Sequence, residues 1–208
     1  NGIHPVIGCE VYVAPRNHKD KEGAPDRDPH HLILLAENDE GYHNLVKLVS
    51  AGFVDGFYYR PRVDRELLRQ HSEGLIALSA CLSGEVPRLI MQGEMKEAKQ
   101  TALLYQEIFG ENYYYLELQE NGMAEQAIVN KGLIEISEMT GIPLVATNDC
   151  HYLNQDDAFA HEVLLCMQTG KTMNSPDRMQ MNTDTLYVRS PDEMETLFAA
   201  FPEALLNT

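Results

Sequence analysis

The sequence has no long hydrophobic run. A membrane-spanning helix needs about 18 or more consecutive apolar residues, and no such stretch occurs. No charged segment followed by an apolar one opens the chain, so no secretory signal is visible. We therefore expect a protein without a membrane partner.

Cationic residues are scarce. The chain has 16 Lys and Arg against 32 Asp and Glu, which gives a formal net charge of -16. A domain that holds nucleic acid by bulk electrostatic attraction is normally basic, so this balance argues against that class. A local basic strip or bound cations could still override it.

Closely spaced cysteine pairs are absent. Four cysteines are scattered along the chain without a CxxC motif, namely Cys9, Cys81, Cys150 and Cys166. In an acidic chain with no visible leader we expect them to be reduced, which favours a cytoplasmic protein. The ordinary role of each is that of a small, buried, inert apolar side chain.

The composition is nevertheless that of a folded domain. Hydrophobic residues make up 44% of the 208 residues, enough for a core, so global disorder is excluded. No repeat, low-complexity tract or linker divides the chain. It opens without Met on an apolar run, and it ends in what resembles an interrupted helix. We expect a slice of a longer polypeptide, with residues 1–208 forming part of one domain.

Strand-like and helix-like segments alternate along the chain. Apolar and aromatic runs predict strands at 6–13, 31–36, 75–81, 113–118, 143–148 and 186–189. Periodicity and capping signals predict helices at 40–51, 87–91, 95–109, 124–140, 156–168 and 191–200, and a short helix capped by Asp64. This alternation favours parallel strand pairing in an α/β layer or barrel fold. In α/β barrels, the chemistry lies at the carboxyl ends of the strands.

The helical spacing also predicts which helix faces are buried. In the helix at 95–109 the inward stripe is Ala98, Ala102, Tyr105 and Phe109, and Gly110 ends the helix. For the helix at 156–168 the predicted inward residues are Ala160, Val163, Leu164 and Met167. In two other helices the apolar residues at helical spacing are Tyr42, Leu45, Val46 and Val49, and Ile128, Leu133, Ile136 and Met139.

Ligand-type residues follow the strand predicted at 143–148. Residues two apart in an extended chain point to the same side, so Asp149 and His151 can converge on one site while Cys150 points away. A carboxylate and an imidazole suit Zn²⁺, Mn²⁺ or Fe²⁺. The alternative is a helix-capping Asp beside a surface His.

Three more candidates lie in or beside predicted strands. Cys81 ends the strand at 75–81, although a lone cysteine there is an ordinary packing residue. Either His30 or His31 can face a site from the next strand, and periodicity does not choose between them. Glu10 lies within an apolar strand, where a carboxylate must be paired, ligate a cation or face solvent.

Taken together, these segments resemble a known family. The segments are residues 7–13 (IGCEVYV), 31–38 (HLILLAEN), 56–62 (GFYYRPR), 74–81 (GLIALSAC), 115–118 (YLEL), 145–152 (VATNDCHY), 160–166 (AHEVLLC) and 202–208 (PEALLNT). In this order they resemble the polymerase-and-histidinol-phosphatase (PHP) domain of bacterial replicative DNA polymerase III alpha subunits. The similarity extends over essentially the whole chain.

The resemblance implies a distorted (βα)7 barrel with up to three divalent metal ions, zinc first and manganese or iron as alternatives. By motif matching, Glu10 resembles the bridging carboxylate, and His31 rather than His30 is the ligand. Cys81, Asp149 and His151 complete the matched metal-binding set, and Glu10 and Asp149 would be the catalytic carboxylates. The family's early motifs, a His-x-His, a further His and an Asp-His-Gly, do not occur here. We expect them in strand–helix units that precede this chain.

The implied chemistry is metal-dependent phosphoester hydrolysis, in this context 3′–5′ proofreading, with DNA synthesis in the rest of the parent polymerase. Arg60 and Arg62 follow three aromatic residues and suit a nucleotide stack and a phosphate clamp. The alternative is a catalytically silent scaffold that braces the polymerase and docks a separate exonuclease subunit. Implied partners are DNA, the sliding clamp and that subunit, in a bacterial cytoplasm. A free-standing phosphatase is a weaker third reading.

Overall fold

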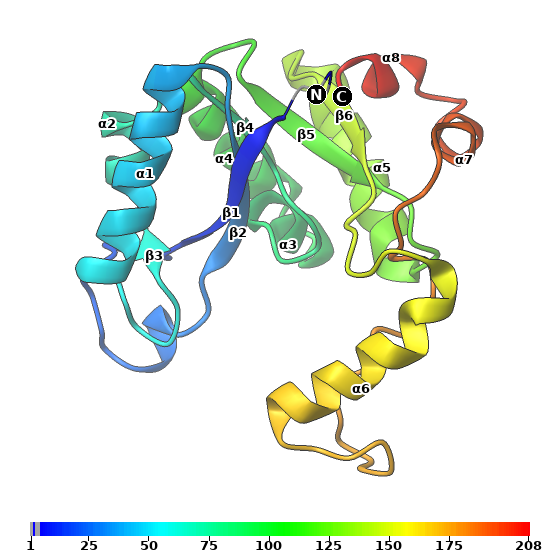
Figure 1. The fold of residues 1–208 in the computed structure, drawn as a ribbon. Helices are drawn as coiled ribbons and strands as arrows, with labels where there is room; N and C mark the ends of the chain where they lie inside the picture. Colours follow the sequence, from blue (N-terminus) through cyan, green and yellow to red (C-terminus); the bar gives the residue numbers. More distant parts are fainter. Residues whose placement is uncertain (1, 3–4) are drawn as a thin grey trace.

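The computed structural model describes residue 2 and residues 5–208, and within them it forms an α/β fold around one mixed sheet (Figure 1). The order across the sheet is β3-β1-β2-β4-β5-β6. The strands are β1 (Ile7–Val13), β2 (His30–Ala36), β3 (Arg62–Val63), β4 (Leu75–Leu78), β5 (Tyr114–Gln119) and β6 (Leu144–Thr147). In the described part of the chain the sheet is open, with β3 and β6 at its edges.

The helices begin and end close to where the capping residues predict. Asp64 accepts a hydrogen bond from the Leu67 N–H, and Gly110 and Gly141 end their helices. The helices are α1 (Asp39–Val54), α2 (Arg65–Gln70), α3 (Glu85–Met91), α4 (Met95–Phe109), α5 (Ala124–Thr140), α6 (Ala158–Thr169), α7 (Pro191–Leu197) and α8 (Pro202–Leu206), with 3₁₀ turns η1 (Ala24–Asp26) and η2 (Gln155–Asp157). None of the helices in this described part is both long and apolar enough to cross a membrane.

The expectation of parallel pairing is wrong for two of the five strand pairs. β2 is antiparallel to both β1 and β4, whereas β1–β3, β4–β5 and β5–β6 are parallel. A parallel pair needs a crossover, usually a helix, whereas the chain between β1 and β2 is a loop with one 3₁₀ turn. The strand expected at 186–189 is reduced to an isolated bridge between Tyr152 and Tyr187.

The core lies between the sheet and its helices. The predicted stripe of α4 is buried at all four positions, and Leu34 and Leu116 of the sheet are fully buried. Complete burial of a leucine side chain contributes about 1.5–3 kcal/mol. The strands therefore gain most of their stability from these apolar faces.

Helix α6 buries a different face from the one that the spacing predicts. In α6, Leu164 and Met167 are 61% and 72% exposed, and Leu165 and Cys166 are buried instead. Figure 1 shows α6 extending away from the sheet, which leaves that predicted face uncovered. The stripes of α1 and α5 are only partly buried: Leu45, Leu133 and Ile136 lie in the core, whereas Tyr42, Val46, Ile128 and Met139 are exposed.

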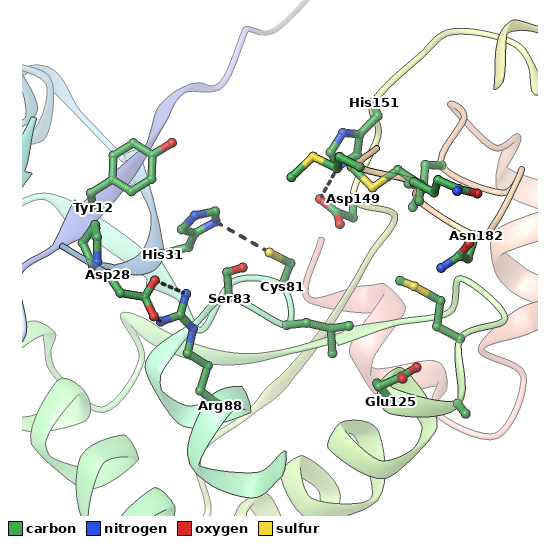
Figure 2. A pocket seen from close by; sticks show the side chains of 18 of the residues that line it. Tyr12, Asp28, His31, Cys81, Ser83, Arg88, Glu125, Asp149, His151 and Asn182 are labelled. Atoms are coloured by element: carbon green, nitrogen blue, oxygen red, sulfur yellow. Dashed lines mark hydrogen bonds and ion pairs between the residues drawn. The ribbon is translucent and has the colours of Figure 1, made fainter. Parts of the chain in front are cut away.

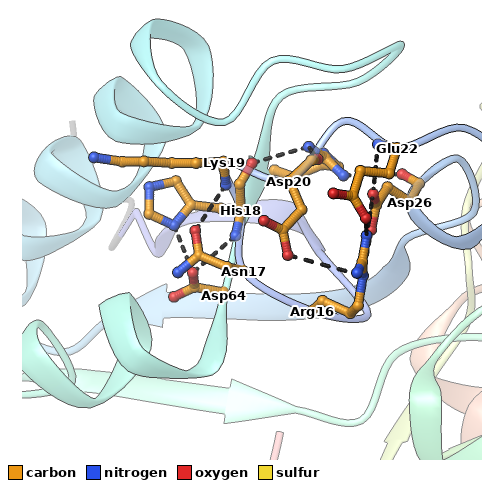
Figure 3. Close-up of polar contacts among 9 residues, drawn as sticks. Arg16, Asn17, His18, Lys19, Asp20, Glu22, Asp26 and Asp64 are labelled. Atoms are coloured by element: carbon orange, nitrogen blue, oxygen red, sulfur yellow. Dashed lines mark hydrogen bonds and ion pairs between the residues drawn. The ribbon is translucent and has the colours of Figure 1, made fainter.

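The loop between β1 and β2 is fixed by polar contacts rather than by apolar packing (Figure 3). Arg16 donates to both carboxylate oxygens of buried Asp26, at 3.0 and 2.8 Å. His18 is buried as well. Its backbone N–H and its Nδ1 both contact Asp64 Oδ2, at 2.8 and 2.5 Å.

Candidate metal centre and its cavity

Sheet register brings three of the predicted ligands together. The β1–β2 pairing sets Glu10 opposite Ile33 and Tyr12 opposite His31, so Glu10 and His31 lie diagonally on one face. Cys81 follows the last residue of β4 and lies at the same end of the sheet as Glu10 and His31. Ligand atoms of Glu10, His31 and Cys81 all lie within 4.8 Å of one another. This register favours His31 over His30, whose Nδ1 is buried without a partner in the described structure.

One nitrogen of His31 faces two acceptors. Nδ1 lies 3.1 Å from Glu10 Oε1 and 3.7 Å from Cys81 Sγ. Burial lowers the pKa of His31, but the hydrogen bonds to Cys81 and Glu10 outweigh it and raise the pKa to about 9. A single proton serves both acceptors, whereas a divalent cation would satisfy the thiolate, carboxylate and imidazole together. The donor set therefore fits a metal ion.

Asp149 and His151 contact each other by a different backbone geometry from the one expected. β6 ends at Thr147, and Asp149 has φ 38°, so this segment is not extended. The turn nevertheless brings Asp149 Oδ1 to 3.5 Å from His151 Nε2. That hydrogen bond is the main reason why the pKa of His151 is raised. Cys150 is exposed beside the Tyr187 carbonyl and not in the core.

The isolated bridge holds this turn in place. His151 donates its backbone N–H to the Leu186 carbonyl at 2.8 Å. Arg189 donates to Asn148 Oδ1 at 2.9 Å and also to the Glu120 carbonyl. The segment 186–189 thus positions the Asp149–His151 pair although it forms no regular strand.

His31 and Cys81 of the first group and the Asp149–His151 pair face one cavity of about 900 Å³ (Figure 2). Its lining includes His31 and Cys81 from one part of the sheet edge and Asp149 and His151 from another. His31 comes from the amino end of its strand, unlike the expected carboxyl ends, because β2 runs antiparallel to its neighbours. Asp149 and His151 lie outside the compact group formed by the other three.

The two arginines proposed as phosphate ligands have different environments. Arg60 is exposed and lines the cavity. Arg62 is fully buried and donates to the backbone carbonyls of Gly56, His18, Asp20 and Asp26. The expectation for Arg62 is corrected on this ground, because its guanidinium is inaccessible and four of its five N–H groups are already used.

Strained backbone marks the cavity. Within the described residues, four non-glycine residues have a positive φ: Tyr59, Ala80, Asp149 and Asn182. Asp149 and Asn182 line the cavity, Ala80 precedes Cys81, and Tyr59 precedes Arg60. Such conformations cost of order 1–3 kcal/mol each and gather at functional sites. Sequence periodicity carries no signal for them.

A buried carboxyl near the cavity was missed as a site candidate. Glu117 of β5 accepts from Thr147 and Gln119, and its second oxygen has no partner in the described structure. Burial is the main cause that raises its pKa, to about 7, and the Asp149 charge adds to the rise. The available signal was the one that selected Glu10, a carboxylate inside an apolar strand.

Comparison with known proteins decides the family. A family model described as "PHP domain" matches residues 1–121. The chain belongs to the PHP domain family. This PHP chain is 47% identical over its whole length to "DNA polymerase III subunit alpha" of Treponema pallidum, covering 18% of that relative. Identity is 45% with the protein of that name from Borreliella burgdorferi, again over the whole chain and 18% of the relative.

A third relative matches the same region. "DNA polymerase III subunit alpha" of Thermus aquaticus is 43% identical over 98% of this chain and 16% of the relative. The PHP chain therefore spans less than a fifth of the length of these relatives and matches one region of the alpha subunit.

Proposed function

We propose that this chain is the PHP domain of a bacterial replicative polymerase alpha subunit and that it holds catalytic divalent metal ions. Glu10, His31 and Cys81 would bind one ion, with Asp149 and His151 binding from the other wall of the cavity. Zinc suits this donor set best, with manganese or iron as alternatives. The observation that carries the proposal is the convergence of three ligand atoms within 4.8 Å at the cavity wall.

The reaction that fits the site is hydrolysis of a phosphoester, here removal of a 3′-terminal nucleotide. Metal ions in such sites lower the pKa of a bound water and neutralise charge on phosphoryl oxygens. The chain's own residues would hold the metal ions and orient their ligands. Glu10 and Asp149 supply carboxylates, and Asp149 fixes the His151 ring through their 3.5 Å contact. The cavity, about 900 Å³, has room for a terminal nucleotide.

The parent protein would be a DNA-directed DNA polymerase whose synthesis site lies outside residues 1–208. We propose that earlier strand–helix units close the open sheet into the barrel and supply the remaining metal ligands. Its partners would be DNA, a sliding clamp and other replicase subunits in the bacterial cytoplasm. The identity to alpha subunits along the whole chain supports this placement.

A second function rests on a separate observation. α6 exposes Phe159, Leu164 and Met167, at 70%, 61% and 72%. An exposed apolar helix face of this kind favours protein contacts. The domain would then brace the polymerase or dock a separate exonuclease subunit, with or without catalysis.

An exonuclease assay of the full-length protein separates these functions. We expect bound metal by mass spectrometry and 3′–5′ degradation of a single-stranded oligonucleotide. Asp149→Ala should reduce degradation about a hundredfold or more, because even outer partners of metal ligands matter 10–100-fold. Asp39→Ala, an exposed aspartate at the start of α1, is the matched control and should leave the rate unchanged. An inactive wild type, or an unaffected Asp149→Ala variant, would leave only the scaffold function.

A further inference from the structure

Two arginines at the cavity lack the partners that the other arginines have. Of the nine arginines in the sequence, seven contact a carboxylate or a backbone carbonyl in the described structure. The Arg60 guanidinium has no hydrogen bond or ion pair in the described structure, and the Arg27 guanidinium donates a hydrogen bond only to the Tyr59 hydroxyl. In a chain with 32 acidic residues, two guanidinium groups that contact neither a carboxylate nor a carbonyl in the described structure stand out. Both line the metal-site cavity.

Each guanidinium lies over a tyrosine ring. The Arg60 guanidinium carbon is 5.8 Å from the centre of the Tyr12 ring, and that of Arg27 is 4.5 Å from the centre of the Tyr59 ring. Tyr12 also meets His31 edge to face, with ring centres 5.1 Å apart. A continuous series of contacts therefore runs from Cys81 through His31 and Tyr12 to Arg60.

The backbone that carries both arginines is anchored. Arg27 follows Asp26, which is fully buried and bound by Arg16. Arg60 pairs with Tyr58 through a 3.0 Å backbone hydrogen bond, two residues before the buried Arg62. Arg62 itself ties the two segments together, because it donates to carbonyls of the loop that carries Arg27. The backbone that carries the two arginines is therefore fixed before any ligand arrives.

We propose that Arg60 with Tyr12 and Arg27 with Tyr59 form a subsite for single-stranded DNA beside the metal centre. The guanidinium groups would bind the phosphodiester next to the scissile one, and a tyrosine face would stack its base. The Tyr12 ring separates this subsite from His31, so an anion on Arg60 differs from one at the metal ligands. The substrate therefore carries at least two phosphates, which selects an oligonucleotide end over a phosphomonoester.

This inference rests on the proposed function for the substrate's identity but makes its own prediction about binding. It also explains how an acidic domain takes an anionic substrate, since only a local pair of arginines is needed. Arg88 lines the same cavity but is held by both oxygens of Asp28, at 2.8 and 3.1 Å, so it is not part of the subsite.

Site-specific crosslinking tests the subsite in the full-length protein. The probe is a short single-stranded oligothymidylate with 5-iodouracil at the penultimate base and phosphorothioate linkages at its 3′ end, which block hydrolysis. After irradiation with zinc present, peptide mass spectrometry should find the probe on Tyr12 or Tyr59. The probe concentration for half-maximal crosslinking should rise about tenfold or more in Arg60→Ala and in Arg27→Ala.

Controls separate this result from other outcomes. Arg69→Ala removes the same charge from an exposed position on α2 and should leave crosslinking unchanged. Both cavity variants should keep wild-type metal content, since neither arginine is a ligand. The subsite would be overturned if the probe never crosslinks to Tyr12 or Tyr59. It would also be overturned if Arg60→Ala and Arg27→Ala reach half-maximal crosslinking at the wild-type probe concentration. Normal crosslinking without exonuclease activity would instead remove the proposed reaction and keep the subsite.

Discussion

One ring nitrogen, His31 Nδ1, faces both other residues of the candidate metal centre. His31 Nδ1 faces Glu10 at 3.1 Å and Cys81 at 3.7 Å, and these two partners raise the pKa of His31 to about 9 against the opposing effect of burial. Without metal, the ring is thus a cation at pH 7. A metal ion binding at Nδ1 takes the place of that proton.

This exchange predicts a pH-dependent affinity. Because His31 loses a proton when metal binds, zinc affinity should rise at least tenfold per pH unit between pH 6 and 8 and rise less steeply above pH 9. Competition with a chelator of known pH dependence measures it. His31→Gln should bind more weakly and lose about one proton from the slope. His43→Gln, on the exposed side of α1, should reproduce the wild-type slope. A pH-independent wild-type affinity would contradict the proton exchange.

Single residues also differ in whether the sequence pattern alone is enough to assign their role. The position of Glu10 in an apolar strand was enough to select it, because a carboxylate there needs a partner. Choosing His31 over His30 required either family resemblance or the β1–β2 register, since both flanking faces of β2 are apolar. Arg62 was misassigned because three of its four carbonyl partners come from a loop that is distant in sequence.

At the scale of elements, α1 is positioned by close backbone contact. A Cβ added to Gly41 would lie 1.7 Å from the Gly74 carbonyl oxygen, which belongs to the turn before β4. A Cβ added to Gly52, later in the same helix, would meet its nearest atoms at 3.5 Å, an ordinary van der Waals contact. Alanine at Gly52 therefore tests helix propensity, whereas alanine at Gly41 tests the packing of α1 against the turn before β4.

Alanine at these glycines should have opposite effects. Gly52→Ala should stabilise α1 by about 0.5–1 kcal/mol through reduced backbone entropy. In Gly41→Ala the clash with Gly74 outweighs that gain and should destabilise the region by about 1–3 kcal/mol. Hydrogen exchange of the α1 amides in the full-length protein measures both changes. Slower exchange in Gly41→Ala than in wild type would show that the turn before β4 does not constrain α1.

Elements with local end signals were the predictable part of this fold. The bounds of α4 and α5 follow from periodicity together with Gly110 and Gly141, which are features of the segments themselves. Strand direction depends on which strands meet, so the antiparallel β1–β2 and β2–β4 pairs were not accessible from local pattern. The prediction of the buried face of α6 is wrong for a related reason. Apolar residues lie all around this helix, and the neighbouring structure determines which of them are buried.

At the scale of the whole molecule, the site is a product of sheet order. Glu10 and His31 come from paired strands β1 and β2, Cys81 follows β4, and Asp149 follows β6, the far edge strand. These candidate ligands are widely separated in sequence, yet the sheet order brings them to one end of the sheet, where all of them except Glu10 line one cavity. The acidic net charge is compatible with a nucleic-acid substrate only through local features such as Arg27 and Arg60.

Anomalous X-ray diffraction at the zinc edge, on crystals of the zinc-loaded full-length protein, tests the central claim most directly. We predict an anomalous peak between Glu10, His31 and Cys81, at about 2.3 Å from the sulfur and about 2.0–2.1 Å from the His31 nitrogen. The peak should disappear in Cys81→Ser crystals or lose most of its height. Zinc peaks elsewhere in the protein with none among these three residues would contradict the account.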